Sequence, residues 1–216
     1  MLFLISFSSF SRTIETDSIG IYLTQNQDLK ALRYAIQQSD KLLKAKSYQK
    51  LCSNNIKKSK IYLKLNDTDK AIQVLFATLH IAEKQKLEFE QVLILNEIAK
   101  NFQQTLNNVK SLHYFRKGEA IALKLPNDTL RAYIRQGLFS VYVQNNKLDS
   151  AKYYMKRIMD THKNKGNFDQ LYRCYSNYSV YYFGINDLNM GKKYLDTSVF
   201  YAEKNKKLRY LKTCYN

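Results

Sequence analysis

The amino-acid sequence predicts an all-α protein, a right-handed α-solenoid built from tandem antiparallel helical hairpins. Three observations support this prediction: few turn residues, a 40-residue internal repeat, and apolar positions at helical spacing. Six Gly and one Pro among 216 residues are too few for a fold rich in tight turns. With 45% hydrophobic and 25% charged residues, a chain of this length can bury a sizeable core.

The repeat consists of three columns, that is, sets of positions that recur every 40 residues. The first column is aromatic: Tyr22, Tyr62, Phe102, Tyr142 and Tyr182. Nine residues further along is a small column: Ala31, Ala71, Ser111, Ala151 and Gly191. Four residues after that is an apolar column on the same helical face: Ala35, Leu75, Phe115, Met155 and Leu195. Two helices per repeat can therefore approach closely at the small column.

The first helix of each repeat is expected to end four residues beyond the aromatic. Asparagines occupy this column as Asn26, Asn66, Asn146 and Asn186. After Gly, Asn best tolerates the left-handed conformation that terminates a helix. In the third repeat Leu106 takes this place, and because Asn107 and Asn108 follow it, we expect the turn there to shift by one residue.

The second helix has matching start and stop signals. Side chains that can accept its first free N–H groups are Asp28, Asp67, Asn108 and Asp187. Lysines suited to the negative end of the helix dipole close it at Lys44, Lys84, Lys124 and Lys204. Ser47, Asn127 and Asn167 are then placed to cap the following first helix. Each helix is thus expected to have about 17 residues and to extend about 25 Å.

With these features the chain resembles the tetratricopeptide repeat (TPR) family. That family has an aromatic in the first helix, a Gly or Asn turn, and a small and then a bulky residue in the second helix, as at Tyr62, Asn66, Ala71 and Leu75. Its typical unit has 34 residues, so the longer period implies longer helices, as in relatives from bacterial signalling proteins. The family's small residue in the first helix is matched by Ser59, Ala99 and Ser179, whereas Phe139 and Ile19 depart from it.

The resemblance covers residues 12–216 as a single solenoid, with repeats starting near 12, 52, 92, 132 and 172. An incomplete sixth repeat begins at about 207, which suggests an anchor or output domain beyond residue 216. Residues 1–11 contain an apolar run without a basic leader and are either a signal peptide or an apolar lead-in to the first helix. A signal would place the repeats outside the cytoplasm, in the periplasm; otherwise the protein is cytoplasmic. No later stretch has the ~18 apolar residues that a membrane span requires.

The segment LYRCYSNYSVYYFGIND, residues 171–187, is rich in tyrosine and could either stack nucleic-acid bases or pack inward. Tyr175, Tyr178 and Tyr182 follow helical spacing on the packing face, and Tyr172 and Tyr181 are expected in the joint between repeats. Base stacking requires exposed aromatics beside a basic groove, and Arg173 is the one basic residue of this segment. The sequence therefore favours packing.

The resemblance implies that the first helices line a concave, partner-binding face. The first-helix positions off the packing face are Lys57, Lys60, Lys64, Asn96, Lys100, Gln103, Gln104, Tyr133, Gln136, Gln144, Arg173 and Asn177. Such amides and cations can hydrogen-bond an extended peptide and attract acidic side chains or a terminal carboxylate. The alternative is an ordinary polar helix face. The Lys and Asn clamp by which some family members grip chaperone tails is not reproduced.

The net charge of +17 suits a polyanion, but the lysines are spread along the chain rather than gathered in one block. His80, His113 and His162 fall in second helices without a recurring nucleophile or carboxylate partner, and no Gly-rich phosphate loop is present. Cys52, Cys174 and Cys214 form no CxxC pair, so neither a disulfide framework nor a zinc site is expected. We expect no catalytic residue, metal or cofactor.

The sequence thus predicts a non-enzymatic module that binds a protein or peptide, acidic segments included, and that serves as the sensor or scaffold part of a larger bacterial signalling protein. The alternative is a helical-repeat nucleic-acid-binding protein that uses its basic surface, but the irregular polar positions do not suit a base code. A regulatory phosphatase of the TPR type would need a catalytic segment, and we find none.

Overall fold

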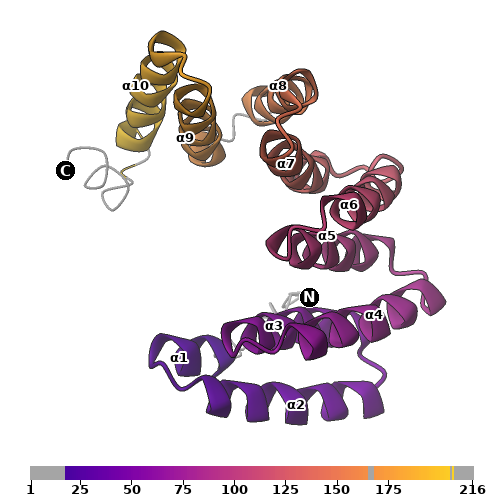
Figure 1. Cartoon of the computed structure of the whole chain (residues 1–216). Helices are drawn as coiled ribbons and strands as arrows, with labels where there is room; N and C mark the ends of the chain where they lie inside the picture. Colours follow the sequence, from indigo (N-terminus) through magenta and orange to yellow (C-terminus); the bar gives the residue numbers. More distant parts are fainter. Residues whose placement is uncertain (1–17, 165–167, 205, 207–216) are drawn as a thin grey trace, which may run out of the picture.

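The computed structural model of the chain describes residues 18–164, 168–204 and 206, which form ten α-helices and no strand. The helices follow one another along an open arc (Figure 1). Their bounds are α1 (Ser18–Thr24), α2 (Asp28–Lys44), α3 (Tyr48–Lys64), α4 (Thr68–Lys84), α5 (Glu88–Gln104), α6 (Asn108–Ala122), α7 (Asp128–Gln144), α8 (Leu148–Asn164), α9 (Phe168–Gly184) and α10 (Leu188–Lys204). The all-α solenoid predicted from the sequence is confirmed.

The helices keep the 40-residue period of the sequence. Helices α3, α5, α7 and α9 begin at residues 48, 88, 128 and 168, and eight of the ten helices have the expected 17 residues. Helices α5 and α7 lie on the inner side of the arc, with α6 and α8 outside them (Figure 1). Helix α3 packs on α5, and α5 packs on α7. The first helices of the repeats therefore form the concave face.

The left-handed turns after the first helices confirm the asparagine column. The backbone φ angles are 56° at Asn26, 60° at Asn66, 55° at Asn146 and 62° at Asn186. The expected shift in the third repeat is wrong, because Leu106 itself adopts a φ of 58°. The N–H of Asn107 donates to the Phe102 carbonyl at 2.8 Å, as in the other turns. Helix packing fixes the turn, so Leu adopts a conformation that costs it free energy.

The capping of the second helices is confirmed in two repeats and corrected in two. The Asp67 carboxylate accepts from the Lys70 N–H at 3.1 Å, and Asp187 accepts from the Met190 N–H at 3.1 Å. In the third repeat Asn107, not Asn108, caps the helix. Asp28 is likewise the first residue of α2 rather than its cap, because the cap is the residue directly after the left-handed one, which is Gln27 in this repeat.

The caps of the following first helices also differ from one another. Asn127 accepts from the Leu130 N–H at 2.9 Å, as expected. Ser47 stands at the cap position of α3, but its side chain makes no capping hydrogen bond. Asn167 lies outside the described residues. Of the closing lysines, Lys44, Lys84 and Lys204 end their helices.

Helix α6 ends at Ala122, two residues before Lys124. The early end of α6 is explained by Pro126, which lacks an N–H and disfavours helical geometry in the residue before it. The prediction of a helix end at Lys124 is therefore wrong for this repeat.

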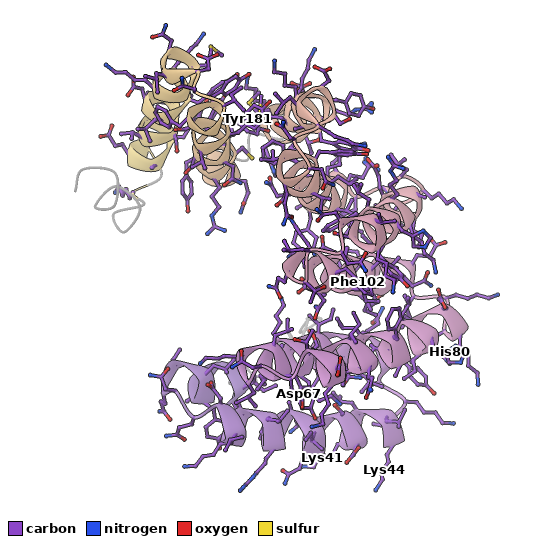
Figure 2. All side chains as sticks on the ribbon, viewed as in Figure 1. Lys41, Lys44, Asp67, His80, Phe102 and Tyr181 are labelled. Carbon is purple, nitrogen blue, oxygen red and sulfur yellow. The ribbon has the colours of Figure 1, made fainter. Side chains whose placement is uncertain are left out.

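The core follows the predicted columns. Ala31, Ala71, Ser111 and Ala151 of the small column are fully buried. All five tyrosines of the segment from 172 to 182 are buried, which confirms their packing role. Figure 2 shows Tyr181 where α9 meets the preceding helices. The Tyr178 hydroxyl donates to the Met155 carbonyl on α8, so this ring also ties two repeats together.

The expectations for residues 1–11, for the repeat from about 207 and for Cys214 lie outside the described residues. Within the described residues, no helix combines the length and the apolarity needed to cross a membrane.

Candidate partner-binding face

The concave face changes character along the arc. One outward-facing column of the first helices reads Lys60 on α3, Lys100 on α5, Ser140 on α7 and Val180 on α9. Lys60 is exposed and Lys100 half-buried, while Val180 is 69% exposed. The face therefore begins as a cationic surface and ends as an apolar one.

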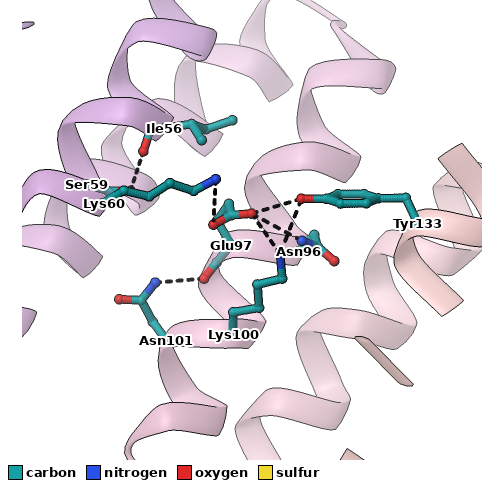
Figure 3. Close-up of polar contacts among 8 residues, drawn as sticks. All are labelled: Ile56, Ser59, Lys60, Asn96, Glu97, Lys100, Asn101 and Tyr133. Atoms are coloured by element: carbon teal, nitrogen blue, oxygen red, sulfur yellow. Dashed lines mark hydrogen bonds and ion pairs between the residues drawn. The ribbon is translucent and has the colours of Figure 1, made fainter. Parts of the chain in front are cut away.

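At the cationic end, the side chain of Glu97 is the centre of a polar cluster (Figure 3). Its Oε2 lies 3.4 Å from the Lys60 Nζ on α3, and its Oε1 lies 3.2 Å from the Lys100 Nζ. The Tyr133 hydroxyl on α7 donates to Oε1 at 3.0 Å. Lys100 also lies over the Tyr133 ring, with its Nζ 5.0 Å from the centroid. The carboxylate thus links three successive repeats.

The charged form of Glu97 is maintained inside the protein. Burial alone disfavours a charged carboxylate, but the ammonium groups of Lys100 and Lys60 more than offset it and hold the Glu97 pKa below its usual range. Burial and the neighbouring Glu97 charge raise the pKa of the Tyr133 hydroxyl, which therefore remains a neutral hydrogen-bond donor.

Asn96 does not stand where the sequence predicted it. It was expected to face a partner, but its side chain is fully buried, because α3, α5 and α7 pack closely around it. Its Nδ2 donates to Glu97 Oε1 at 3.3 Å, and its buried Oδ1 has no partner among the described residues. Asn96 supports the cluster from within rather than lining the surface.

Two further lysines predicted for the concave face, Lys57 and Lys64, interact with other groups of the protein. The Lys64 Nζ lies 2.7 Å from the Asp28 carboxylate at the start of α2. Lys57 is half-buried and has a partner of its own. The cationic half of the predicted face is therefore largely compensated by the chain's own groups.

Three predicted glutamines lie near the ends of their helices. The Gln103 Nε2 donates to the Ser140 hydroxyl on α7 at 2.8 Å and so bridges two repeats. Gln104 and Gln144, one repeat apart, are exposed at the C-terminal ends of α5 and α7.

At the other end of the face, a groove runs between α7 and α9. It consists of two adjoining hollows of about 490 and 420 Å³ that share Gln136 and Asn177 in their linings. The larger hollow is mainly apolar and includes Phe139, Val143 and Val180. The smaller one includes Tyr133 and Arg173. Four of the twelve predicted site residues therefore meet at this groove.

The groove exists because α7 and α9 stand further apart than the preceding first helices. Ser59 on α3 and Ala99 on α5 are small where each helix faces the next, and those helices pack closely. The corresponding residue on α7 is Phe139, whose ring contacts Tyr178 and Tyr181 with centroids 5.7 and 6.1 Å apart. Helices α7 and α9 make little close backbone contact, since these aromatic rings lie between them.

The two amides shared by the hollows are equipped for hydrogen bonding. Neither Gln136 nor Asn177 makes a side-chain hydrogen bond to another described residue, and Gln136 is half-buried while Asn177 is exposed. Arg173 stands beside them, with its Nε donating to the Tyr172 hydroxyl at 2.9 Å. An amide side chain can bind both the N–H and the C=O of an extended peptide. The groove thus combines amides, a cation and an apolar hollow.

The described residues offer little reactive chemistry. No group of three or more His, Cys, Asp or Glu among them could hold a metal ion. Burial, with a smaller contribution from Glu90, raises the pKa of the Cys52 thiol to about 11, and burial raises that of Cys174 to about 12. Both thiols are therefore protonated at neutral pH and poor nucleophiles. Burial also lowers the pKa of His162, which lines the smaller hollow.

Sequence reasoning missed two residues that shape this face. Glu97 shares its column with Lys57, Gly137 and Asn177, and its acidic character could have been noticed as the exception. Val180 was not among the predicted site residues, although its column also contains Lys60 and Lys100 and therefore faces outward.

No protein-family model matches the sequence, and the comparison with curated proteins finds no match. Among solved structures, the chain is similar to aspartyl phosphate phosphatase F from Bacillus subtilis, with a TM-score of 0.79 and 15% identity over 92% of this chain and 52% of that one. It is also similar to a Rap protein complexed with competence and sporulation factor, with a TM-score of 0.70 and 14% identity over 91% of this chain and 59% of that one.

A third similar structure contains kinesin light chain TPR-like repeats from Podosopora anserina, with a TM-score of 0.68 and 13% identity over 88% of this chain and 93% of that one. The chain spans about half the length of the phosphatase. These likenesses extend over most of the described helices and agree with the repeat pattern of the sequence. The chain is a TPR-like helical-repeat array.

Proposed function

We propose that the protein is a non-enzymatic module that binds an extended segment of a partner protein along its concave face. The observation that carries this proposal is the groove between α7 and α9, where Gln136 and Asn177 have no hydrogen-bond partner among the described residues and stand beside an apolar hollow. Amides bind the peptide backbone, and the hollow accepts an apolar side chain. The likeness in fold to solved kinesin light chain TPR-like repeats supports the proposal.

The acidic partner expected from the sequence is not favoured at this groove. Lys60 and Lys100 pair with Glu97, and Lys64 pairs with Asp28. The groove itself contributes Arg173 as a cation beside amide and apolar groups. The segment that fits it best is neutral overall, with at least one apolar side chain for the hollow near Val180.

The sharpest test is capture of partners by the full chain and by two matched variants at low and moderate salt. Val180→Glu places a carboxylate in the apolar hollow, while Val109→Glu makes the same change at an 82% exposed position in the first turn of α6. We expect a discrete protein or peptide that survives moderate salt, is retained by Val109→Glu and is lost from Val180→Glu. Equal retention by the two variants would overturn the groove as the binding site.

Nucleic-acid binding is the second candidate, and the net charge of +17 is the observation that favours it. Binding of this kind rests on phosphate contacts and weakens steeply as salt rises. Nucleic acid retained at moderate salt by both valine variants would replace the peptide proposal. Retention at low salt alone would reflect only the general positive charge.

We further propose that the module serves as a sensor or scaffold in bacterial signalling. The likeness in fold to aspartyl phosphate phosphatase F and to a Rap protein complexed with competence and sporulation factor supports this role. Identification of the captured partner tests it: a regulatory protein or signalling peptide supports the role, and a partner without regulatory activity would overturn it.

A further inference from the structure

The polar cluster at Glu97 contains the donors of an anion-binding site. We call its donors, Lys60, Asn96, Lys100 and Tyr133, the anion cradle. Two ammonium groups, a phenolic hydroxyl and an amide NH₂ converge on one carboxylate from three successive first helices (Figure 3). The same donor set would suit a carboxylate or a phosphate group of a ligand.

A ligand could reach this cradle from the concave side. The side chains of Lys60 and Lys100 are 53% and 42% exposed, whereas that of Glu97 is only 6% exposed. The Glu97 carboxylate thus contacts the two ammonium groups from the protein interior. The exposed parts of the lysine side chains face the concave side, where a partner would lie.

The amide of Asn96 is fixed by this arrangement. Its Nδ2 faces the Glu97 carboxylate at 3.3 Å, and its buried Oδ1 has no partner in the part of the chain that the structure describes. The opposite amide orientation would point Oδ1 at the carboxylate, which would repel it, so the observed orientation leaves one acceptor unsatisfied. The Asn96 amide thus turns its donor toward the negative charge of Glu97.

The repeat itself does not require an acid at this position. The column contains Lys57, Gly137 and Asn177 in the other repeats, so the repeat pattern itself calls for no acid here. Glu97 is therefore a feature of this repeat rather than of the fold.

We propose that Glu97 is a specificity-determining residue: it fills the anion cradle from within and so excludes acidic segments and phosphate groups from the face formed by α3, α5 and α7. Removing its charge exposes a site for oxyanions. As a statement about the partner, this inference rests on the proposed function; the filled cradle is a property of the chain alone.

The test compares the full-length wild type with Glu97→Gln and Glu83→Gln, using calorimetric titration with inorganic phosphate and with a hexaglutamate peptide at low ionic strength. Glu83 is a surface residue paired with Lys117 at 3.0 Å, so its variant controls for the change in net charge. We expect Glu97→Gln to bind both probes at least about tenfold more tightly than the other two proteins, since charge-assisted hydrogen bonds to the lysines become available. Equal affinities in the two variants would overturn the proposal.

A second comparison remains decisive if Glu97→Gln folds poorly. In the wild-type background, Lys60→Gln should lower phosphate affinity no more than Lys41→Gln, because Lys60 is already occupied by Glu97. Lys41 is an exposed residue of α2 that points away from the rest of the protein (Figure 2). A selective loss in Lys60→Gln would show that the cradle is open to anions and would overturn the proposal.

These outcomes are independent of partner capture. Loss of the partner in Val180→Glu with no gain of phosphate binding in Glu97→Gln would retain the proposed function and reject the role of Glu97. A gain of phosphate binding in Glu97→Gln with no loss of the partner in Val180→Glu would retain the proposed role of Glu97 and reject the groove as the binding site.

Discussion

The ring of Phe139 on α7 packs edge-on against the ring of Tyr178 on α9, with 5.7 Å between the centroids. Phe139 occupies the column that contains Ser59, Ala99 and Ser179, so a bulky side chain stands where α3, α5 and α9 carry a small one. The same residue therefore fills the core between two repeats and keeps open the groove above it.

Replacement of Phe139 by Ala should be strongly destabilising. The side chain is buried, and loss of a buried Phe typically lowers the free energy of unfolding by about 3–5 kcal/mol. Phe200→Ala is the matched control, because that ring is 57% exposed on α10 and its loss should lower the unfolding free energy by about 1 kcal/mol or less. Urea unfolding measures both. A similar loss in the two variants would contradict a core role for Phe139.

The ion pairs of Glu97 should make stability depend on pH in the acid range. Because its folded-state pKa is depressed, the carboxylate contributes stability above its unfolded pKa of about 4.3, and this contribution is lost as the pH falls through the folded value. The difference in unfolding free energy between the wild type and Glu97→Gln should therefore be constant above pH ~5 and shrink below pH ~4.

Chemical unfolding of both proteins across this range measures the effect. Glu83→Gln provides the reference, since the Glu83 carboxylate is 43% exposed and its pair with Lys117 lies at the surface. A difference between wild type and Glu97→Gln that stays constant to pH 3 would contradict the assigned charge state.

Most of the fold could be predicted from the sequence because helical period, left-handed Asn residues and small packing positions are local signals. The face was less predictable. Asn96 and Gln136 occupy the same column one repeat apart, yet Asn96 is fully buried and Gln136 lines a groove. The difference comes from the spacing between neighbouring helices, which Phe139 sets from another column. The burial of one residue thus depends on the size of a side chain in another column. It therefore cannot be predicted from the position of that residue in the repeat alone.

The pairing of charges was equally hidden in the sequence. Lys60 and Glu97 are 37 residues apart, and only the stacking of α3 on α5 brings them to 3.4 Å. The lysines of this face could be predicted from the sequence, but the carboxylates that pair with them could not.

Replacing Leu106 in its left-handed turn should stabilise the protein. Leu106 has a φ of 58° and is 72% exposed, so replacing it by Asn relieves backbone strain while losing little buried surface. We expect Leu106→Asn to raise the unfolding free energy by about 1 kcal/mol. The reciprocal change, Asn66→Leu, should lower it by a similar amount, because Asn66 adopts the same conformation with a φ of 60°. Two changes of the same sign would refute this account of the turn.

Two glycines on inner helices should respond oppositely to Ala. A Cβ on Gly137 would lie 2.0 Å from Cε1 of Phe115, a fully buried ring of α6. Gly137→Ala should therefore lower the unfolding free energy by about 1–3 kcal/mol through overpacking. At Gly184, the last residue of α9, a Cβ meets no atom of the described residues within 4 Å, so Ala should raise stability by up to about 1 kcal/mol through its helix propensity. Thermal unfolding followed by circular dichroism measures both. Because the two changes add the same methyl group to helices of the same kind, a shared response would mean that the close approach of Phe115 to α7 does not control the packing of this repeat.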